Sequence, residues 1–356
     1  MTATRRHVYR FLPGLRLAVT GDAATVRHFD REYGPGRVAG TDAAEVVVRF
    51  DAVPSVSLAS HQRHVASAGG HKSVRWKVAL GDPGERPLTA AITLRGLPRS
   101  FGLSLVQGYF VESLISLAAP AAGHALVPAA ALVTHDQAVL MLGPSGAGKS
   151  SLSARVIASG GIVIGDDQVL LNRAGQCSAF PRRMRFYPDL ADTAPDAFRA
   201  LRRSTRLRLR TRGLVDRMTA GFVRPSLAVD AAELDRAHEP GSGTISRVLV
   251  LEPRAPVRDL ESIPEELSSA VSTARRVFEL QRARLWSIAP PEWRALINEV
   301  AEIEEQILTA AFRRARLERV RIPAHWEPKR SIDALAAVVG AIPAAKDHLH
   351  SEASAH

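Results

Sequence analysis

The sequence predicts an α/β fold with a β-rich N-terminal domain, a central domain of alternating strands and helices, and a mainly helical C-terminal segment. Apolar and β-branched runs separated by Gly, Pro and Asp fill the first hundred residues. The centre alternates strand-like and helix-like segments around a glycine-rich loop. A long amphipathic pattern beginning at Pro290-Pro291 predicts a C-terminal helix. The predicted parts are 1–98, 99–255, 256–343 and a flexible tail, 344–356.

Composition indicates a globular protein, because 46% of the 356 residues are hydrophobic and only 23% are charged. The single cysteine, Cys177, excludes an intrachain disulfide and an all-cysteine metal site, and suits a reducing compartment. Arg10 and Arg16 interrupt the apolar N-terminus, so no signal peptide is expected. We therefore predict a cytoplasmic protein.

The most apolar stretch, residues 103–133, is long enough to raise the question of a membrane span. Gln107, Glu112 and Pro120 interrupt it, together with His124 and Pro128. We expect a buried helix over 100–118 followed by a strand over 124–133, and no membrane partner.

The formal net charge of +11 is concentrated in one region. Residues 182–217 contain eleven arginines and four carboxylates. No aromatic residue lies between Arg199 and Arg217, so single-stranded nucleic acid is a poor candidate partner. An exposed basic face, or a site for an acidic peptide, fits better. Residues 196–218 fit a helix in their first half, and the Arg-Leu alternation over 206–210 fits a strand as well.

The N-terminal strands are expected within 8–21, 44–53, 71–80 and 87–96, on β-branched and apolar content. A turn at His135-Asp136 then leads into a strand over 138–143. A helix over 149–159, a Gly-Gly break, and strands over 162–165 and 168–172 follow. Pro181 and Pro188 make 179–190 extended or looped. Residues 244–253 form the last predicted strand, and residues 289–317 the long helix.

Residues 143–150, GPSGAGKS, match the phosphate-binding pattern GxxxxGK[ST] between a predicted strand and a predicted helix. Glycines let successive backbone N–H groups approach phosphate oxygens, and the helix N-terminus adds its positive end. Lys149 is expected to neutralise the β and γ phosphates and Ser150 to bind Mg²⁺. The alternative is a glycine-rich turn that matches by chance. The predicted nucleotide-binding residues are Gly143, Ser145, Gly146, Ala147, Gly148, Lys149, Ser150 and Ser151.

Asp166 and Asp167 end the short apolar strand that follows the loop helix, 17 and 18 residues after Lys149. This compact spacing could place both carboxylates beside the γ phosphate of a bound nucleotide. One would hold magnesium while the other accepts the proton of an incoming hydroxyl group. The alternative is that one aspartate only caps a turn.

Three consecutive segments, "GPSGAGKS", "SLSARVIASG" and "GIVIGDD", resemble the catalytic domain of the HPr kinase/phosphorylase family of bacterial serine kinases. The resemblance covers about residues 125–173. It implies ATP and Mg²⁺ as cofactors, Lys149 as a catalytic phosphate contact, and Asp166 as the base that activates an acceptor serine. It further implies Asp167 as the neighbouring acid, binding the metal with Ser150, and a homo-oligomer, a hexamer by family analogy.

The chain departs from that family at several positions. Pro128 and Ser151 stand where the family usually carries a His and a Glu, and the second family signature is matched only by Arg212-Gly213-Leu214. Phosphorylase activity and HPr as the acceptor are therefore not implied. The chain is more similar to divergent relatives found beside peptide-modification genes, some of which phosphorylate a serine of a precursor peptide.

The leading hypothesis is therefore an ATP-dependent kinase that phosphorylates a Ser or Thr hydroxyl of a peptide or protein, with an acidic segment suiting the arginines. Arg182, Arg183 and Arg185 follow the aspartates closely enough to reach their site, and Arg183 and Arg185 are candidate contacts to the phosphoryl group or the acceptor. A salt-bridging loop is the alternative for these arginines. Two alternative functions stay open: a small-molecule P-loop kinase, and a nucleotide-binding regulatory protein without kinase activity.

Overall fold

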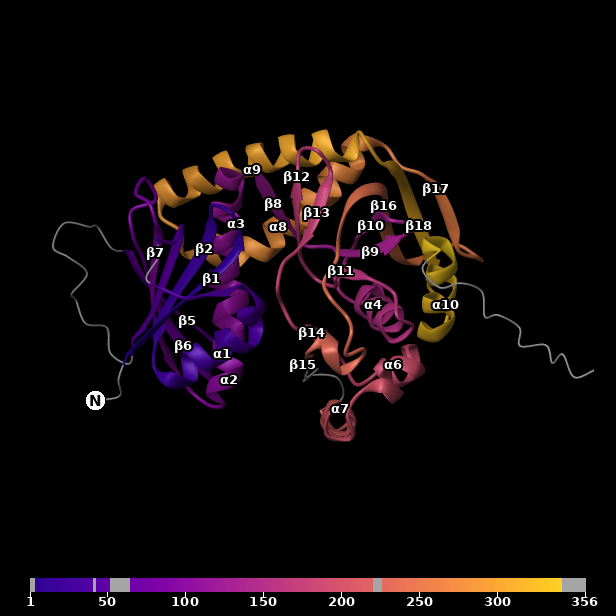
Figure 1. Cartoon of the computed structure of the whole chain (residues 1–356), viewed down its shortest axis with the longest axis horizontal. Coiled ribbons are helices and arrows are strands. Elements are labelled where there is room, and N and C mark those ends of the chain that lie inside the picture. The colour runs from indigo at the N-terminus through magenta and orange to yellow at the C-terminus, as the bar shows by residue number, and fades with distance from the viewer. Residues whose placement is uncertain (1–3, 41–42, 52–64, 220–225, 341–356) are drawn as a thin grey trace, which may run out of the picture.

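The computed structural model describes residues 4–40, 43–51, 65–219 and 226–340. The predicted tail, 344–356, lies outside them. Two β-sheets stand side by side, and two long C-terminal helices run across both (Figure 1). The protein is therefore a mixed α/β protein, as predicted.

The first sheet has seven strands in the order β3-β1-β2-β4-β7-β6-β5. Neighbours are antiparallel except in the pairs β2–β4 and β4–β7, which are parallel. The strands predicted between residues 8 and 96 are present. The bounds are β1 (Arg5–Leu12), β2 (Leu15–Gly21), β3 (Arg37–Val38), β4 (Val46–Asp51), β5 (Val65–His71), β6 (Val74–Leu80) and β7 (Leu88–Arg95).

Helices cover one face of this sheet. Helix α1 (Ala23–Tyr33) begins at Asp22, whose carboxylate accepts a hydrogen bond from the Thr25 amide at 2.9 Å. A continuous helical segment follows β7 and contains one π-helical turn. Its parts are α2 (Arg99–Val106), η2 (Gln107–Val111), α3 (Glu112–Ala118) and the 3₁₀ turn η3 (Ala119–Ala122). The predicted helix over 100–118 is thus confirmed, whereas α1 was not predicted.

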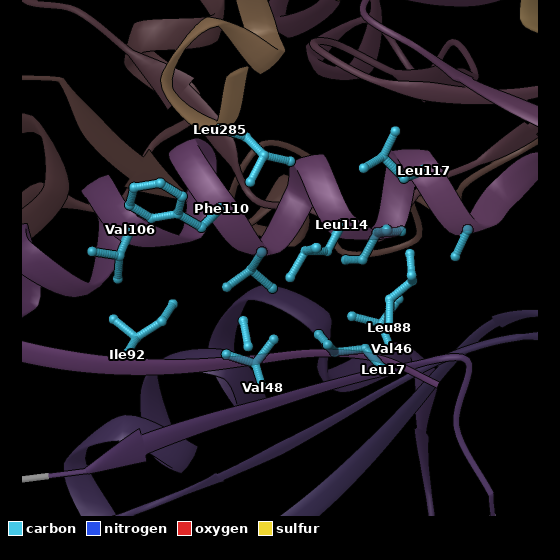
Figure 2. Packing of buried hydrophobic residues seen from close by; sticks show 14 of the residues in the cluster. Leu17, Val46, Val48, Leu88, Ile92, Val106, Phe110, Leu114, Leu117 and Leu285 are labelled. Atoms are coloured by element: carbon cyan, nitrogen blue, oxygen red, sulfur yellow. The ribbon is translucent and has the colours of Figure 1, made fainter. Parts of the chain in front are cut away.

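The apolar face of this helical segment packs on the first sheet (Figure 2). Phe110 and Leu114 lie opposite strand residues such as Val48. The helical segment, Arg99–Ala122, is long and apolar enough to cross a membrane, but 72% of its most apolar window is buried inside the protein. Its hydrophobicity is therefore explained by a core position, as in soluble proteins.

The second sheet follows the path β11-β9-β10-β16-β13-β12-β8, with β18 beside β16 and β17 beside β18. The predicted turn at His135-Asp136 connects β9 to β10, and both residues have positive φ. The long strand β16 belongs to both halves of the sheet, because it pairs with β10, β13 and β18. The bounds are β8 (His124–Val127), β9 (Ala130–Thr134), β10 (Gln137–Leu142), β11 (Val163–Gly165), β12 (Val169–Asn172), β13 (Gln176–Ala179), β16 (Ser242–Ala255), β17 (Glu261–Pro264) and β18 (Arg316–Pro323).

Two long antiparallel helices, α8 (Leu267–Ile288) and α9 (Pro291–Phe312), connect the sheets. Trp293 of α9 packs in the core of the first sheet and donates a hydrogen bond to the Gly81 carbonyl at 2.8 Å. Phe312, at the other end of α9, packs in the core of the second sheet. The C-terminal part is therefore helical, as expected, but it also adds β17 and β18 to the second sheet.

The remaining elements surround the helix that follows β10, α4 (Lys149–Ala158). They are β14 (Met184–Phe186), α5 (Leu190–Thr193), α6 (Pro195–Ala200), α7 (Arg203–Met218), β15 (Leu227–Val229), η4 (Ala231–Glu233) and α10 (Pro328–Val339). The arginine-rich stretch forms the end of α6 and the whole of α7, with a break at Leu201 and Arg202. Residues 206–210 lie inside α7, so the strand alternative for their Arg-Leu alternation was wrong. Within α7, Leu209 is buried, whereas the Leu207 side chain is 63% exposed.

Candidate functional site

The glycine-rich loop and the two aspartates meet at one edge of the second sheet. Strand β9 is antiparallel to both β10 and β11, so β10 and β11 run in the same direction. The loop follows the carboxyl end of β10, and Asp166 follows the carboxyl end of β11. In α/β sheets this is the edge at which ligands bind.

The loop backbone requires glycine at two positions. Gly146 and Gly148 have φ angles of +83° and +91°, a region that residues with a side chain rarely adopt. A Cβ atom on Gly148 would also lie 2.4 Å from Cδ1 of Ile332. Gly148 immediately precedes α4, so the loop leads directly into the helix N-terminus.

Lys149 bends back over the loop. Its Nζ donates hydrogen bonds to the carbonyl oxygens of Gly143, at 2.7 Å, and Pro144, at 3.0 Å. Burial lowers the pKa of Lys149, and the nearby charges of Asp167 and Asp166 partly oppose that shift. Lys149 therefore lies close enough to both carboxylates to interact with them electrostatically.

Asp166 is 6% exposed, and its environment favours the protonated form. Burial, followed by repulsion from Asp167, raises its pKa to about 7. The Ser150 hydroxyl donates a hydrogen bond to the Asp166 carboxylate, which opposes the shift. Its Oδ2 is buried and has no hydrogen-bond partner among the described residues. An unsatisfied buried oxygen of this kind is costly to the folded state.

Asp167 is about half exposed and is held by an arginine. Its Oδ2 lies 2.5 Å from Nη1 of Arg182. The same guanidinium lies 3.3 Å from the buried Glu112 on α3. Burial alone would lower the pKa of Arg182, but the charges of Glu112 and Asp167 outweigh it and raise that pKa above its usual range. Arg182 thus links Asp167 to the helices on the first sheet.

Glu112 is the centre of a buried polar network. Its carboxylate accepts hydrogen bonds from Gln107 at 2.9 Å, from the Tyr33 hydroxyl at 3.3 Å and from Gln168 at 3.4 Å. Gln168 directly follows the aspartate pair, so residues of the first sheet's helices support the backbone that carries that pair.

The other predicted site residues lie near the loop but have different contacts. Ser145 is exposed and Ala147 is buried. The Ser151 hydroxyl lies 3.0 Å from the Thr193 hydroxyl. Arg183 pairs with the buried Glu32 of α1 at 2.5 Å, and Arg185 has a buried Nε without a hydrogen-bond partner among the described residues.

The donor set at the loop fits a magnesium ion bound together with nucleotide phosphates. Among the described residues there is no group of three or more His, Cys, Asp or Glu side chains that could hold a metal ion. Mg²⁺ at phosphoryl-transfer sites commonly uses one or two carboxylates and completes its shell with phosphate oxygens and water. The Ser150 hydroxyl and the unpartnered Oδ2 of Asp166 are oxygen ligands of the required type. Asp167, the metal ligand implied by the resemblance, instead contacts Arg182.

Sequence patterns did not single out Glu32 and Glu112 as part of this site. A signal for Glu112 was present, because it is an acid inside an otherwise apolar helix and such a residue needs a buried partner. No local pattern marks Glu32, whose partner lies 151 positions away.

Comparison with models of known protein families and with curated proteins finds no match to this chain.

Proposed function

We propose that this protein is an ATP-dependent kinase of the HPr-kinase type that transfers the γ-phosphoryl group to a Ser or Thr hydroxyl of a peptide or protein in the cytoplasm. One observation carries the proposal. A buried carboxylate, Asp166, contacts the serine of a GxxxxGKS loop, keeps one oxygen unpartnered and has a pKa of about 7. The motif resemblance over 143–167 supports the same reading.

In the proposed reaction, the loop amides and Lys149 hold the nucleotide phosphates and orient the γ-phosphorus atom. The acceptor hydroxyl oxygen forms the new P–O bond, and the bond between the γ-phosphorus and its bridging oxygen breaks, so that ADP leaves. The Asp166 carboxylate accepts the hydroxyl proton when Asp166 is the base and Asp167 is the acid on the metal side. A base with a pKa close to the working pH is well suited to this step. A bound magnesium ion would supply charge neutralisation at the phosphates.

The two aspartates can divide these roles in either order. The hydrogen bond from Ser150 favours Asp166 as the metal-side carboxylate, with Asp167 as the base. The raised pKa and the free oxygen favour Asp166 as the base. Magnesium titrations of ATP binding separate the two orders. If Asp166 holds the metal, Asp166→Asn weakens the magnesium dependence of ATP binding. If Asp166 is the base, Asp166→Asn leaves that dependence unchanged.

The test of the function is transfer of label from γ-labelled ATP with Mg²⁺ to a panel of acceptors: serine peptides, threonine peptides, free serine and simple sugars. Label on acid-stable phosphoserine or phosphothreonine in peptides, absent with Lys149→Ala, is the expected result. Label on the small alcohols alone would indicate a small-molecule kinase. ATP binding without transfer to any acceptor would contradict the proposal and favour a regulatory protein.

A further inference from the structure

A second feature borders Asp166 on the side of the first sheet. The first sheet with its helices forms one part of the molecule, and the second sheet with the elements around it forms the second part. A cavity of about 250 Å³ lies between these two parts. Arg10 and Phe11 of β1 line one side, and Gly165 and Asp166 line the other. The link from β13 to β14, which runs between the two parts in Figure 1, contributes Phe180 and Arg182. The first sheet therefore forms a wall of a cavity that includes the proposed catalytic carboxylate.

Ordered contacts hold this wall in place. The Phe11 ring packs on Phe180 with centroids 4.9 Å apart and on Tyr33 with centroids 5.3 Å apart. The ion pair between Glu32 and Arg183 joins α1 to the same link. Because these contacts connect the first sheet to the segment that follows the aspartates, the cavity is a preformed part of the fold.

The size of the cavity limits what it can hold. Pockets for drug-sized ligands usually enclose roughly 300 to 1,000 Å³. A cavity of about 250 Å³ is smaller, so it suits one or two side chains of a larger molecule whose remaining atoms lie outside. This favours an acceptor that is a peptide segment over a complete small molecule.

The chemistry of the lining indicates which side chains these are. Aliphatic and aromatic groups predominate, among them Phe11, Val163 and Met184. Asp166 is the one carboxylate in the lining, and its Oδ2 has no hydrogen-bond partner. Arg10 is exposed at the cavity and makes no ion pair with a described residue. An apolar side chain therefore fits the walls, a hydroxyl fits Asp166, and an acidic side chain fits Arg10.

We propose that this cavity is the acceptor site, and that it takes a peptide segment whose Ser or Thr is flanked by an apolar residue and an acidic residue. The inference rests on the proposed kinase function and adds the substrate class and the part played by the first sheet. It also gives that sheet a role in recognition, since Arg10 and Phe11 contact the acceptor and not the nucleotide.

The first experiment measures transfer to four probes: a hexapeptide with Leu and Glu beside a central Ser, the same peptide with Leu replaced by Gly, the same peptide with Glu replaced by Lys, and free serine. The Leu/Glu peptide is expected to have a kcat/KM about tenfold above each substituted peptide, and more above free serine. Equal kcat/KM for all peptides would overturn the inference.

The second experiment blocks the cavity by alkylating a cysteine introduced at its edge. Cys177 is the chain's one cysteine, it is fully buried, and burial raises the pKa of its thiol to about 12, so it is unreactive. Arg10→Cys therefore adds a unique accessible thiol at the cavity. Arg6→Cys, on the same strand and also exposed but outside the lining, is the matched control.

Each variant is compared with itself before and after alkylation with N-ethylmaleimide, so differences in folding do not enter. Alkylation of Arg10→Cys is expected to reduce peptide labelling at least about tenfold while the Kd for ATP stays the same. Alkylation of Arg6→Cys should change neither. Labelling that survives alkylation of Arg10→Cys would overturn the inference and leave the kinase intact. Wild-type protein that labels no acceptor at all would overturn the kinase and the acceptor site together.

Discussion

Each of the two parts of the molecule buries a carboxylate, and the two carboxylates have opposite environments. Glu32, on the first sheet's helix α1, is 2% exposed and pairs with Arg183. Burial would raise its pKa, but the charge and the hydrogen bond of Arg183 outweigh burial, and the pKa of Glu32 is lowered. Asp166, beside the glycine-rich loop, is similarly buried, but burial and repulsion from Asp167 raise its pKa to about 7.

The difference separates a structural charge from a functional one. A buried acid with its own cation is part of the fold, and its ionised form stabilises the native state. Each of the two carboxylates has one buried oxygen without a hydrogen-bond partner among the described residues, so the difference lies in the neighbouring charge. A buried acid whose pKa is raised by burial and by a second carboxylate costs stability when it is ionised, and such groups concentrate at sites that bind ligands or transfer protons. Glu32 therefore holds the two parts together, while Asp166 is available for chemistry.

The largest expected effect is on nucleotide binding, and it is confined to the second part. Lys149→Ala is expected to weaken ATP binding about 100-fold or more, because it removes from a partly buried site the charge that we propose contacts the phosphates. The fold should be retained, because the Lys149 ammonium bonds only to carbonyls of its own loop. Isothermal titration with ATP and Mg²⁺ measures the loss. Lys77→Ala, an exposed lysine on β6, is the control and should bind ATP like the wild type.

Asp166→Asn is expected to stabilise the protein, most strongly at high pH. The folded-state pKa of about 7 lies above the unfolded value, so the stability associated with this group is full at low pH and is lost as pH rises through about 7. Removing the charge should raise the free energy of unfolding at pH 8 by up to about 4 kcal/mol, and by little at pH 4. Urea unfolding at both pH values measures this. An unchanged or lower stability at pH 8 would contradict the assignment of Asp166 as an unpaired buried acid.

Glu32→Gln is expected to act in the opposite direction. It leaves the Arg183 guanidinium, which is 25% exposed, without its carboxylate, and should cost about 2 kcal/mol at pH 7. Because the pKa of Glu32 is lowered on folding, its stabilisation is present at neutral pH and is lost as pH falls through the folded pKa. The difference from the wild type should therefore shrink in acid. The same urea series checks this, and a difference that grew in acid would be inconsistent with a paired Glu32.

The smallest effect is expected where an ion pair lies on the surface. Asp196 and Arg199 form a pair on α6 in which both side chains are about 70% exposed. Asp196→Asn should change the free energy of unfolding by less than about 0.5 kcal/mol, since exposed pairs are screened by water and salt. A loss as large as that of Glu32→Gln would remove the distinction between buried and exposed pairs on which the comparison depends.

The features that could be predicted from the sequence are those set by short spacings. The glycine-rich loop, its helix and the strand that precedes Asp166 form one contiguous stretch, so a local pattern was sufficient to find them. The N-terminal strands and helix α9 were also predicted, because alternation and helical periodicity are local signals. The arginine-rich α7 was harder, because its exposed leucines hide the helical pattern.

The features that could not be predicted depend on residues far apart in the chain. Phe11 and Arg10 reach the cavity near Asp166 only because β1 and β11 are brought together by the packing of two sheets. The pairs of Arg183 with Glu32 and of Arg182 with Glu112 join segments separated by 151 and 70 positions. No periodicity in the sequence encodes such pairs. Within the arginine cluster, Arg182 contacts Asp167 while Arg183 pairs with the distant Glu32.

The central claim is that Asp166 acts as the base. Its most direct test is a single-turnover assay that measures transfer of label to the Leu/Glu serine peptide. The wild type and Asp166→Asn are compared at equal occupancy by ATP. We expect the variant to bind ATP with a Kd within about threefold of the wild type and to transfer label about 10² to 10⁴ times more slowly, as loss of a base requires. Transfer by Asp166→Asn at the wild-type rate would show that this buried carboxylate does not perform the chemistry.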